Sequence, residues 1–100
     1  GLKVLERVGS VLKNTQSKII RVEGHTENEQ INTRLKKKYS TNWELSTARA
    51  TNVVRFLQEK IGIEPGFLQP IGMSEYHPVA SNETPDGRSQ NRRIEIALLP

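Results

Sequence analysis

The chain has 100 residues, of which 34% are apolar and 26% are charged, and its net charge is +4. This composition predicts one domain, residues 1–100, with a modest core, and the absence of cysteine excludes a disulfide framework or a thiolate metal site. No apolar run approaches the ~20 residues of a membrane-spanning helix. The positive charge suits an anionic partner, such as nucleic acid, anionic lipid or an acidic cell-wall glycan, and it also favours solubility.

Helical and strand-like apolar periods alternate, which predicts a two-layer α/β sandwich with helices on one face of a small mixed sheet. The expected elements are a helix over 2–14 that ends near Asn14, a strand over 18–24, a long polar loop over 25–42, a helix over 41–61, a strand over 67–73, a short helical turn over 87–91 and a strand over 92–99. The first helix begins without a cap. We therefore expect a fragment of a longer protein, with a targeting or anchoring segment upstream.

Local signals predict how the middle elements begin and end. Thr41, followed three residues later by Glu44, forms a capping-box pattern that starts the central helix, and Gly62 ends it. Pro70 cannot donate a hydrogen bond in a sheet ladder, so the strand that contains it should lie at an edge or carry a bulge.

Metal binding and catalysis find little support in the sequence. Glu23, His25 and Glu27 alternate along the first strand and would offer two carboxylates and an imidazole to a divalent metal. Gly24 interrupts that strand, and only the distant His77 could add a ligand, so we expect a solvated strand end and no metal or other cofactor. The single aspartate and the absence of a glycine-rich phosphate loop argue against an enzyme, including a cell-wall hydrolase.

A basic cluster offers a nucleic-acid alternative. Lys36, Lys37 and Lys38 precede Tyr39, with Arg34 nearby, and basic residues that flank an aromatic ring can hold phosphates and stack a base. The cluster is short and no recognised nucleic-acid motif accompanies it. A solvated loop is the preferred interpretation, and we expect no nucleic-acid partner.

Arg49 lies beside the apolar stripe of the central helix, where a leucine or alanine would be ordinary. The end of the first strand, His25-Thr26-Glu27, and the early helical residues Asn42 and Arg49 should meet at one crevice. Such a pocket suits a zwitterion, because Arg49 can bind a carboxylate while Glu27 receives an ammonium group. The alternative is a plain Arg49–Glu27 salt bridge, worth about 0–1 kcal/mol if exposed. The residues alone leave both interpretations open.

Several polar blocks occur in a fixed order. They are Glu23-Gly24-His25-Thr26, Asn42-x-x-Leu45-Ser46-x-x-Arg49-Ala50, then Gly72, Pro78 and Asn82, and finally Gly87-Arg88-x-x-Asn91-Arg92-Arg93. This pattern, across residues 19–98, resembles the OmpA-like C-terminal domain, whose members bind peptidoglycan non-covalently and tether envelope proteins to the cell wall. The resemblance implies a βαβαβ-type α/β sandwich, with the usual first strand upstream of Gly1 and missing from this chain.

The resemblance also implies a binding site for the diaminopimelate of the peptidoglycan stem peptide. Arg49 would engage the ligand carboxylate, while Glu27 and Thr26 would engage its amine and backbone. Glu27 stands where the family has aspartate, which keeps the charge but adds about 1.5 Å of reach. The expected site residues are Thr26, Glu27, Asn42, Leu45, Arg49, Asn91 and Arg92.

Four of these residues have more specific expected roles. Asn42 would fix the orientation of the peptide, and Leu45 would supply an apolar wall. Arg92 shares strand parity with the apolar residues that follow it, so it should lean toward the helix layer, and Arg93 should face away. Asn91 would cap or bond nearby.

The implied setting is the periplasm or cell envelope, with the parent protein tethered to the inner or outer membrane by segments absent from this chain. Dimerisation is one expected source of avidity. Ile31 in the long loop and the stretch from Tyr39 to Ser46 resemble the MotB branch of the family, which contains the flagellar stator subunits.

Overall fold

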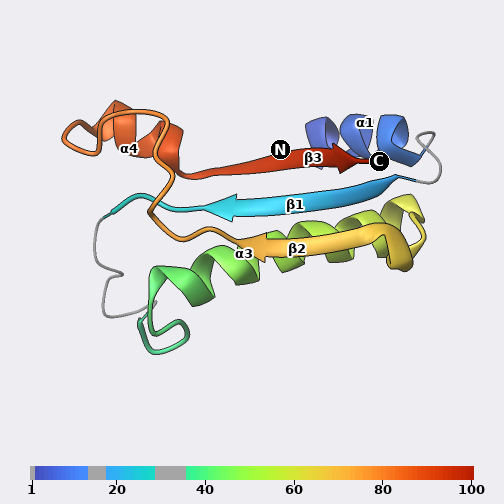
Figure 1. Cartoon of the computed structure of the whole chain (residues 1–100), viewed down its shortest axis with the longest axis horizontal. Helices are drawn as coiled ribbons and strands as arrows, with labels where there is room; N and C mark the ends of the chain where they lie inside the picture. Colours follow the sequence, from blue (N-terminus) through green and yellow to red (C-terminus); the bar gives the residue numbers. More distant parts are fainter. Residues whose placement is uncertain (1, 14–17, 29–35) are drawn as a thin grey trace.

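The structure is a computed structural model that describes residues 2–13, 18–28 and 36–100. Its elements, in chain order, are α1 (Leu2–Lys13), β1 (Ile19–His25), α3 (Asn42–Phe56), the π-helical turn η1 (Leu57–Ile61), the 3-10 turn η2 (Pro65–Phe67), β2 (Leu68–Gly72), α4 (Pro85–Asn91) and β3 (Arg93–Leu99) (Figure 1). The predicted α/β class is confirmed. The expected helix end at Asn14 lies outside the described residues.

The sheet has the strand order β2-β1-β3. β1 runs parallel to β2 and antiparallel to β3, so the sheet is mixed, as predicted. β2 lies at an edge, which explains how Pro70 is accommodated: its missing N–H faces no neighbouring strand within the described sheet.

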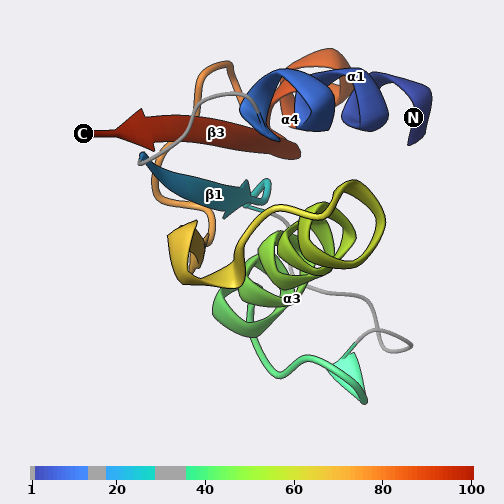
Figure 2. The same ribbon diagram turned by 90° about the vertical axis from the view of Figure 1, so that its right-hand side faces the viewer.

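The helices α1 and α3 cover one face of this sheet, and the opposite face carries no helix in the described ranges (Figures 1 and 2). Strand alternation decides which residues meet the helices. Ile20 and Val22 point into the core, while Glu23 and Glu95 project from the open face. The buried core consists of Leu12, Ile20, Val22, Ala50, Leu57, Ile63 and Leu68. None of the described helices is long and apolar enough to cross a bilayer.

Two glycines let α3 approach the sheet closely. Gly24 of β1 and Gly72 of β2 are paired in register. A Cβ on Gly24 would lie 2.2 Å from the backbone oxygen of Ser46, and a Cβ on Gly72 would lie 2.0 Å from Oγ1 of Thr47. The first turns of α3 therefore rest directly on the strands, in contact that no larger residue would permit.

The ends of the central helix agree with the prediction. The backbone N–H of Thr41 donates to the Glu44 carboxylate at 2.7 Å, and the Trp43 N–H donates to the Thr41 hydroxyl oxygen at 3.1 Å. This is the predicted capping box. At the other end, Gly62 adopts a left-handed conformation with φ of 84° and terminates the helix.

Replacing Thr41 with alanine is expected to lower the free energy of unfolding by about 1 kcal/mol, because the first turn of α3 loses its side-chain cap. Urea unfolding followed by circular dichroism would measure the loss. Thr51→Ala is the matched control: the hydroxyl of Thr51 bonds only the carbonyl of Thr47 within α3, where alanine is the better helix former. Equal losses in the two variants would contradict the capping role.

The cap should also weaken in acid. The hydrogen bond from Thr41 lowers the pKa of the Glu44 carboxyl. A lowered pKa means that the contribution is present above the pKa of an unfolded glutamate, about 4.3, and disappears as the pH falls through the lower folded value. The stability difference between the wild type and Thr41→Ala should therefore shrink below that pH.

Candidate functional site

A pocket of about 380 Å³ opens where the end of β1, the middle of α3 and the start of β3 meet. It brings together side chains that are far apart in the sequence, and four of them, His25, Arg49, Arg92 and Arg93, are basic or titratable. Its lining residues are His25, Arg49, Asn52, Val53, Arg92, Arg93 and Ile94. The combination of cationic groups with an apolar floor suits a small anionic ligand.

Arg49 is half-buried in the wall of this pocket. Within the described part of the chain, its guanidinium makes no ion pair or hydrogen bond with another side chain. A planar guanidinium offers five N–H donors in a fork that matches a carboxylate. Arg49 is therefore available to an external anion.

Glu27 follows β1 and is engaged by other arginines. Its carboxylate forms an ion pair with Arg92 at 2.9 Å and lies 3.5 Å from Nε of Arg88. The plain Arg49–Glu27 salt bridge considered from the sequence is thus not formed, because Glu27 is occupied by the α4–β3 junction. The interpretation of Arg49 as a ligand-binding arginine stays a prediction.

Thr26 and Asn42 hold the segments around Glu27. Thr26 is buried, and its backbone N–H donates to the carbonyl of Ser74 at 2.9 Å. The Asn42 side chain donates to the backbone oxygen of Glu27 at 3.3 Å and to the carboxylate of Glu75 at 3.4 Å. Asn42 therefore ties the start of α3 to the end of β1, and neither it nor Thr26 lines the pocket itself.

Two predicted site residues lie in the interior. Leu45, in the first turns of α3, is buried and does not line the pocket, so it does not supply the apolar wall expected of it there. Asn91 is 0% exposed, and all its hydrogen-bonding groups are used. Its oxygen accepts from the N–H groups of Val79 and Ala80 at 2.8 and 3.0 Å, and its amide donates to the carbonyl of Ala80 and to Asn82. Asn91 therefore bonds nearby, as expected, and its side chain supports the 79–82 loop and does not line the pocket.

Arg92 and Arg93 divide between two environments. Arg92 lines the pocket, on the side expected from its parity. Arg93 binds the carboxylate of Glu95 and donates to the carbonyl of His77 at 2.8 Å, although it also borders the pocket. The hydrogen bond from Arg93 lowers the pKa of the Glu95 carboxyl.

The structure adds residues to the predicted site. Asn52 and Val53 follow Arg49 by three and four positions, and Arg88 precedes Arg92 by four. Residues three and four apart on a helix share a face, so helical periodicity applied around Arg49 would have found Asn52 and Val53. Arg88 does not line the pocket and joins the site through its ion pair with Glu27.

The prediction of a solvated strand end is wrong, because His25 is buried, with 3% of its surface exposed. Of the trio Glu23, His25 and Glu27, Glu27 is held by Arg88 and Arg92. Lys36 to Lys38 are exposed, and the ammonium group of Lys38 lies 5.6 Å from the ring centre of Tyr39. Arg34 and Ile31 lie outside the described residues.

A larger groove of about 470 Å³ lies along the outer side of α3, lined mainly by Tyr39, Trp43, Thr47 and Ala48. Its one charged lining residue is Glu44, which is already engaged in the helix cap. Because no cation lines it, this groove is less suited to a carboxylate than the pocket around Arg49.

A family model described as the OmpA family matches residues 2–92. Motility protein B of Bacillus subtilis (strain 168) is 36% identical over 95 residues, which cover 95% of this chain and 35% of that protein. Peptidoglycan-binding protein ArfA of Mycobacterium tuberculosis is 31% identical over 96 residues, which cover 96% of this chain and 27% of that protein. This chain thus corresponds to about a third or less of these two relatives.

A solved structure agrees with the sequence relatives. The cell wall anchor of the T6SS from Pseudomonas aeruginosa superposes with a TM-score of 0.83 at 36% identity, covering 95% of this chain and 63% of that chain. The family match extends over most of the sequence, and the fold matches over nearly all of it. The chain belongs to the OmpA family.

Proposed function

We propose that this domain binds the diaminopimelate-containing stem peptide of peptidoglycan non-covalently and thereby anchors an envelope protein to the cell wall. The observation that carries the proposal is the Arg49 guanidinium, which lines a pocket and has no protein partner among the described residues. The relatives named as a peptidoglycan-binding protein and as a cell wall anchor support the same ligand.

The charges around the pocket favour an anionic ligand. Of the arginines that line the pocket, Arg92 is paired with Glu27 and Arg93 with Glu95, so the positive charge of Arg49 is the one left uncompensated among the described lining arginines. A free carboxylate of the stem peptide would bind the fork of Arg49 with two charge-assisted hydrogen bonds. Arg92 is close enough to the pocket to add attraction.

Besides its ion pairs, Glu27 has a proposed role in binding the ligand. Its ion pairs with Arg92 and Arg88 hold the carboxylate at the edge of the site, where an ammonium group of the ligand would meet it. Thr26 and Asn42 fix the backbone on either side of Glu27 and act as positioning residues. Leu45 is one of the buried residues of α3.

Ligand specificity provides the direct test. Some stem peptides contain lysine in place of diaminopimelate. Lysine lacks the second carboxylate, so the carbon that bears its side-chain amine is not chiral. Sedimentation with the insoluble polymers measures the affinity of the domain for each of them. The affinity for diaminopimelate-type peptidoglycan should be about tenfold or more higher than that for lysine-type peptidoglycan, since one charge-assisted contact contributes roughly 1.5–3 kcal/mol. Equal retention on both polymers would refute recognition of the carboxylate.

Two rival functions predict different outcomes when the domain is incubated with peptidoglycan. A cell-wall hydrolase would release soluble fragments from the polymer, whereas we expect none, and membership of the OmpA family agrees with a non-enzymatic domain. A nucleic-acid binder would depend on its exposed lysines. Charge reversal of Lys36, Lys37 and Lys38 should therefore leave sedimentation with peptidoglycan largely intact.

The cellular setting follows from the ligand. Peptidoglycan lies in the periplasm or outside the cytoplasmic membrane, so we place the domain in the cell envelope, with other segments of its parent protein providing the tether. The relation to Motility protein B supports a parent of the MotB type. A single pocket would bind weakly, and a repeating polymer or a second copy of the domain would add avidity.

A further inference from the structure

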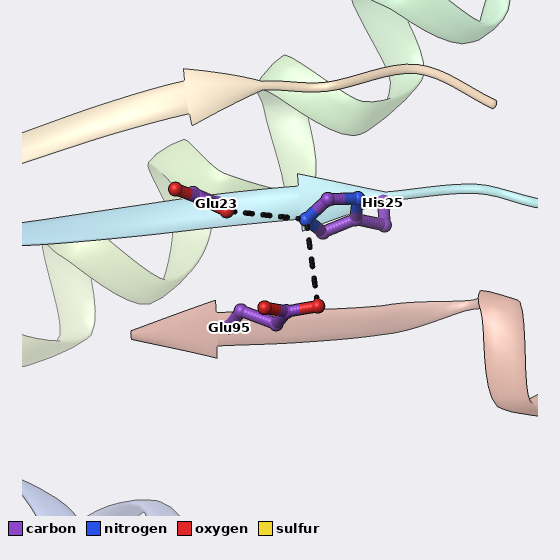
Figure 3. A group of neighbouring side chains, drawn as sticks. All are labelled: Glu23, His25 and Glu95. Atoms are coloured by element: carbon purple, nitrogen blue, oxygen red, sulfur yellow. Dashed lines mark hydrogen bonds and ion pairs between the residues drawn. The ribbon is translucent and has the colours of Figure 1, made fainter. Parts of the chain in front are cut away.

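Three potential metal ligands, Glu23, His25 and Glu95, gather at the sheet next to the Arg49 pocket, and His25 also lines that pocket. Glu23 and His25 are two residues apart on β1, so they point to the same side, and Glu95 of β3 is paired in register with Glu23. Figure 3 shows the two carboxylates directed at the ring of His25. Strand pairing thus joins residues that are 70 positions apart in the sequence.

The three ligand atoms have a spacing close to that around a metal ion. Nε2 of His25 lies 3.3 Å from Oε1 of Glu23 and 3.8 Å from Oε2 of Glu95. All three atoms lie within 4.8 Å of one another. Ligands bound at about 2.0–2.2 Å in a tetrahedral site lie a little over 3 Å apart, so small side-chain rotations would complete the set.

The surroundings of His25 favour a positive ion between these groups. The side chain is only 3% exposed, and two carboxylates converge on the same ring nitrogen. Its other nitrogen, Nδ1, is buried and has no hydrogen-bond partner in the described part of the chain. The imidazole is therefore held by its contacts with Glu23 and Glu95, which a cation would strengthen.

Arg93 is the competitor for this position. Its Nε already binds the Glu95 carboxylate, while its other nitrogens donate to the backbone carbonyls of Asn91 and His77. A metal ion would have to share Glu95 with Arg93 or displace that one contact. The ring of His77 lies 6.1 Å from that of His25, so it could supply a fourth ligand after a rotation.

We propose that Glu23, His25 and Glu95 form a binding site for a divalent zinc ion that links β1 to β3. One imidazole and two carboxylates, with room for His77 or water, are a ligand set that suits zinc. The ion would join the central strand to an edge strand beside the pocket. It would therefore stabilise the fold, and it requires neither Arg49 nor Glu27.

Zinc titration of the metal-stripped domain tests the proposal, with calorimetry for affinity and thermal unfolding for stability. The wild type should bind one zinc ion per chain, and its Tm should rise with zinc concentration. Glu23→Gln and Glu95→Gln should each weaken binding by about tenfold or more. Glu83→Gln, which changes an exposed glutamate in the 79–84 region, should behave as the wild type does.

Two further variants separate this site from its neighbours. Arg93→Gln should raise zinc affinity, because it removes the competitor for Glu95. Arg49→Ala should keep zinc binding whether or not it loses peptidoglycan, so the two proposals can fail independently. Two results would overturn the site. One is a wild type that gives no heat of zinc binding and no zinc-dependent change in Tm. The other is a pair of glutamine variants that bind zinc as well as the wild type.

Discussion

The Arg49→Ala variant is expected to bind diaminopimelate-type peptidoglycan at least about tenfold more weakly than the wild type while remaining folded. The guanidinium has no partner to leave behind among the described residues, so its removal should cost little stability. The expected loss is that of a forked, charge-assisted contact to the ligand, roughly 1.5–3 kcal/mol. Sedimentation with the insoluble polymer, over a range of protein concentrations, measures the affinity.

Two companion variants make this result specific. Arg49→Lys keeps the charge but loses the planar fork, so it should recover only part of the binding. Arg55→Ala removes another arginine of α3, one whose side chain is exposed and paired with Glu59 at 3.2 Å. Arg55→Ala should sediment as the wild type does. If Arg49→Ala also does so, Arg49 does not contact the ligand.

The Gly24→Ala variant is expected to lose about 3 kcal/mol or more of stability, the upper part of the range for overpacking. The new methyl group would lie 2.2 Å from the backbone oxygen of Ser46, and a helix backbone cannot rotate away as a side chain can. The first turns of α3 would have to lift from β1. Urea unfolding would show the loss as a lower transition midpoint.

Gly66→Ala provides the control for the change from glycine to alanine. Apart from Gly66 itself and its two chain neighbours, no described atom lies within 4 Å of the position that its Cβ would occupy, so the added methyl group meets open space. Reduced freedom of the unfolded chain should leave this variant as stable as the wild type or slightly more stable. Similar losses at Gly24 and Gly66 would show that the contact between β1 and α3 is not the cause.

Local chemistry made much of the fold predictable. The capping box at Thr41 and the left-handed Gly62 define α3 and its extension within a few residues. Pro70 predicted a strand that lies at an edge or carries a bulge, and β2 is an edge strand. These signals act between residues that are close in the sequence, so a single chain displays them fully.

The ion-pair partners of charged side chains were harder to predict from the sequence. The sequence allowed an ion pair between Glu27 and Arg49, but the α4–β3 junction places Arg92 and Arg88 next to Glu27 instead. Glu95 joins Glu23 only because β3 pairs with β1 in one register. Such contacts depend on how distant segments assemble, which periodicity does not encode.

Burial separated residues that share a motif. Asn91 and Arg92 are adjacent, yet one is enclosed by the 79–82 loop and the other lines the pocket. A loop that folds back over Asn91 supplies hydrogen-bond partners for both its side-chain oxygen and its NH2 group. No sequence pattern within residues 79–92 predicts that this loop covers Asn91.

The central position of β1 has a mechanical consequence for the proposed role as a cell-wall anchor. β1 is hydrogen-bonded to β2 on one side and to β3 on the other, and the Arg49 pocket lies at its carboxyl end. Tension applied at the pocket along the strand direction would shear both ladders at once, so many hydrogen bonds would share the load before any of them broke. Force applied across the sheet would instead peel an edge strand away one bond at a time, so the domain should resist pulling most strongly along β1.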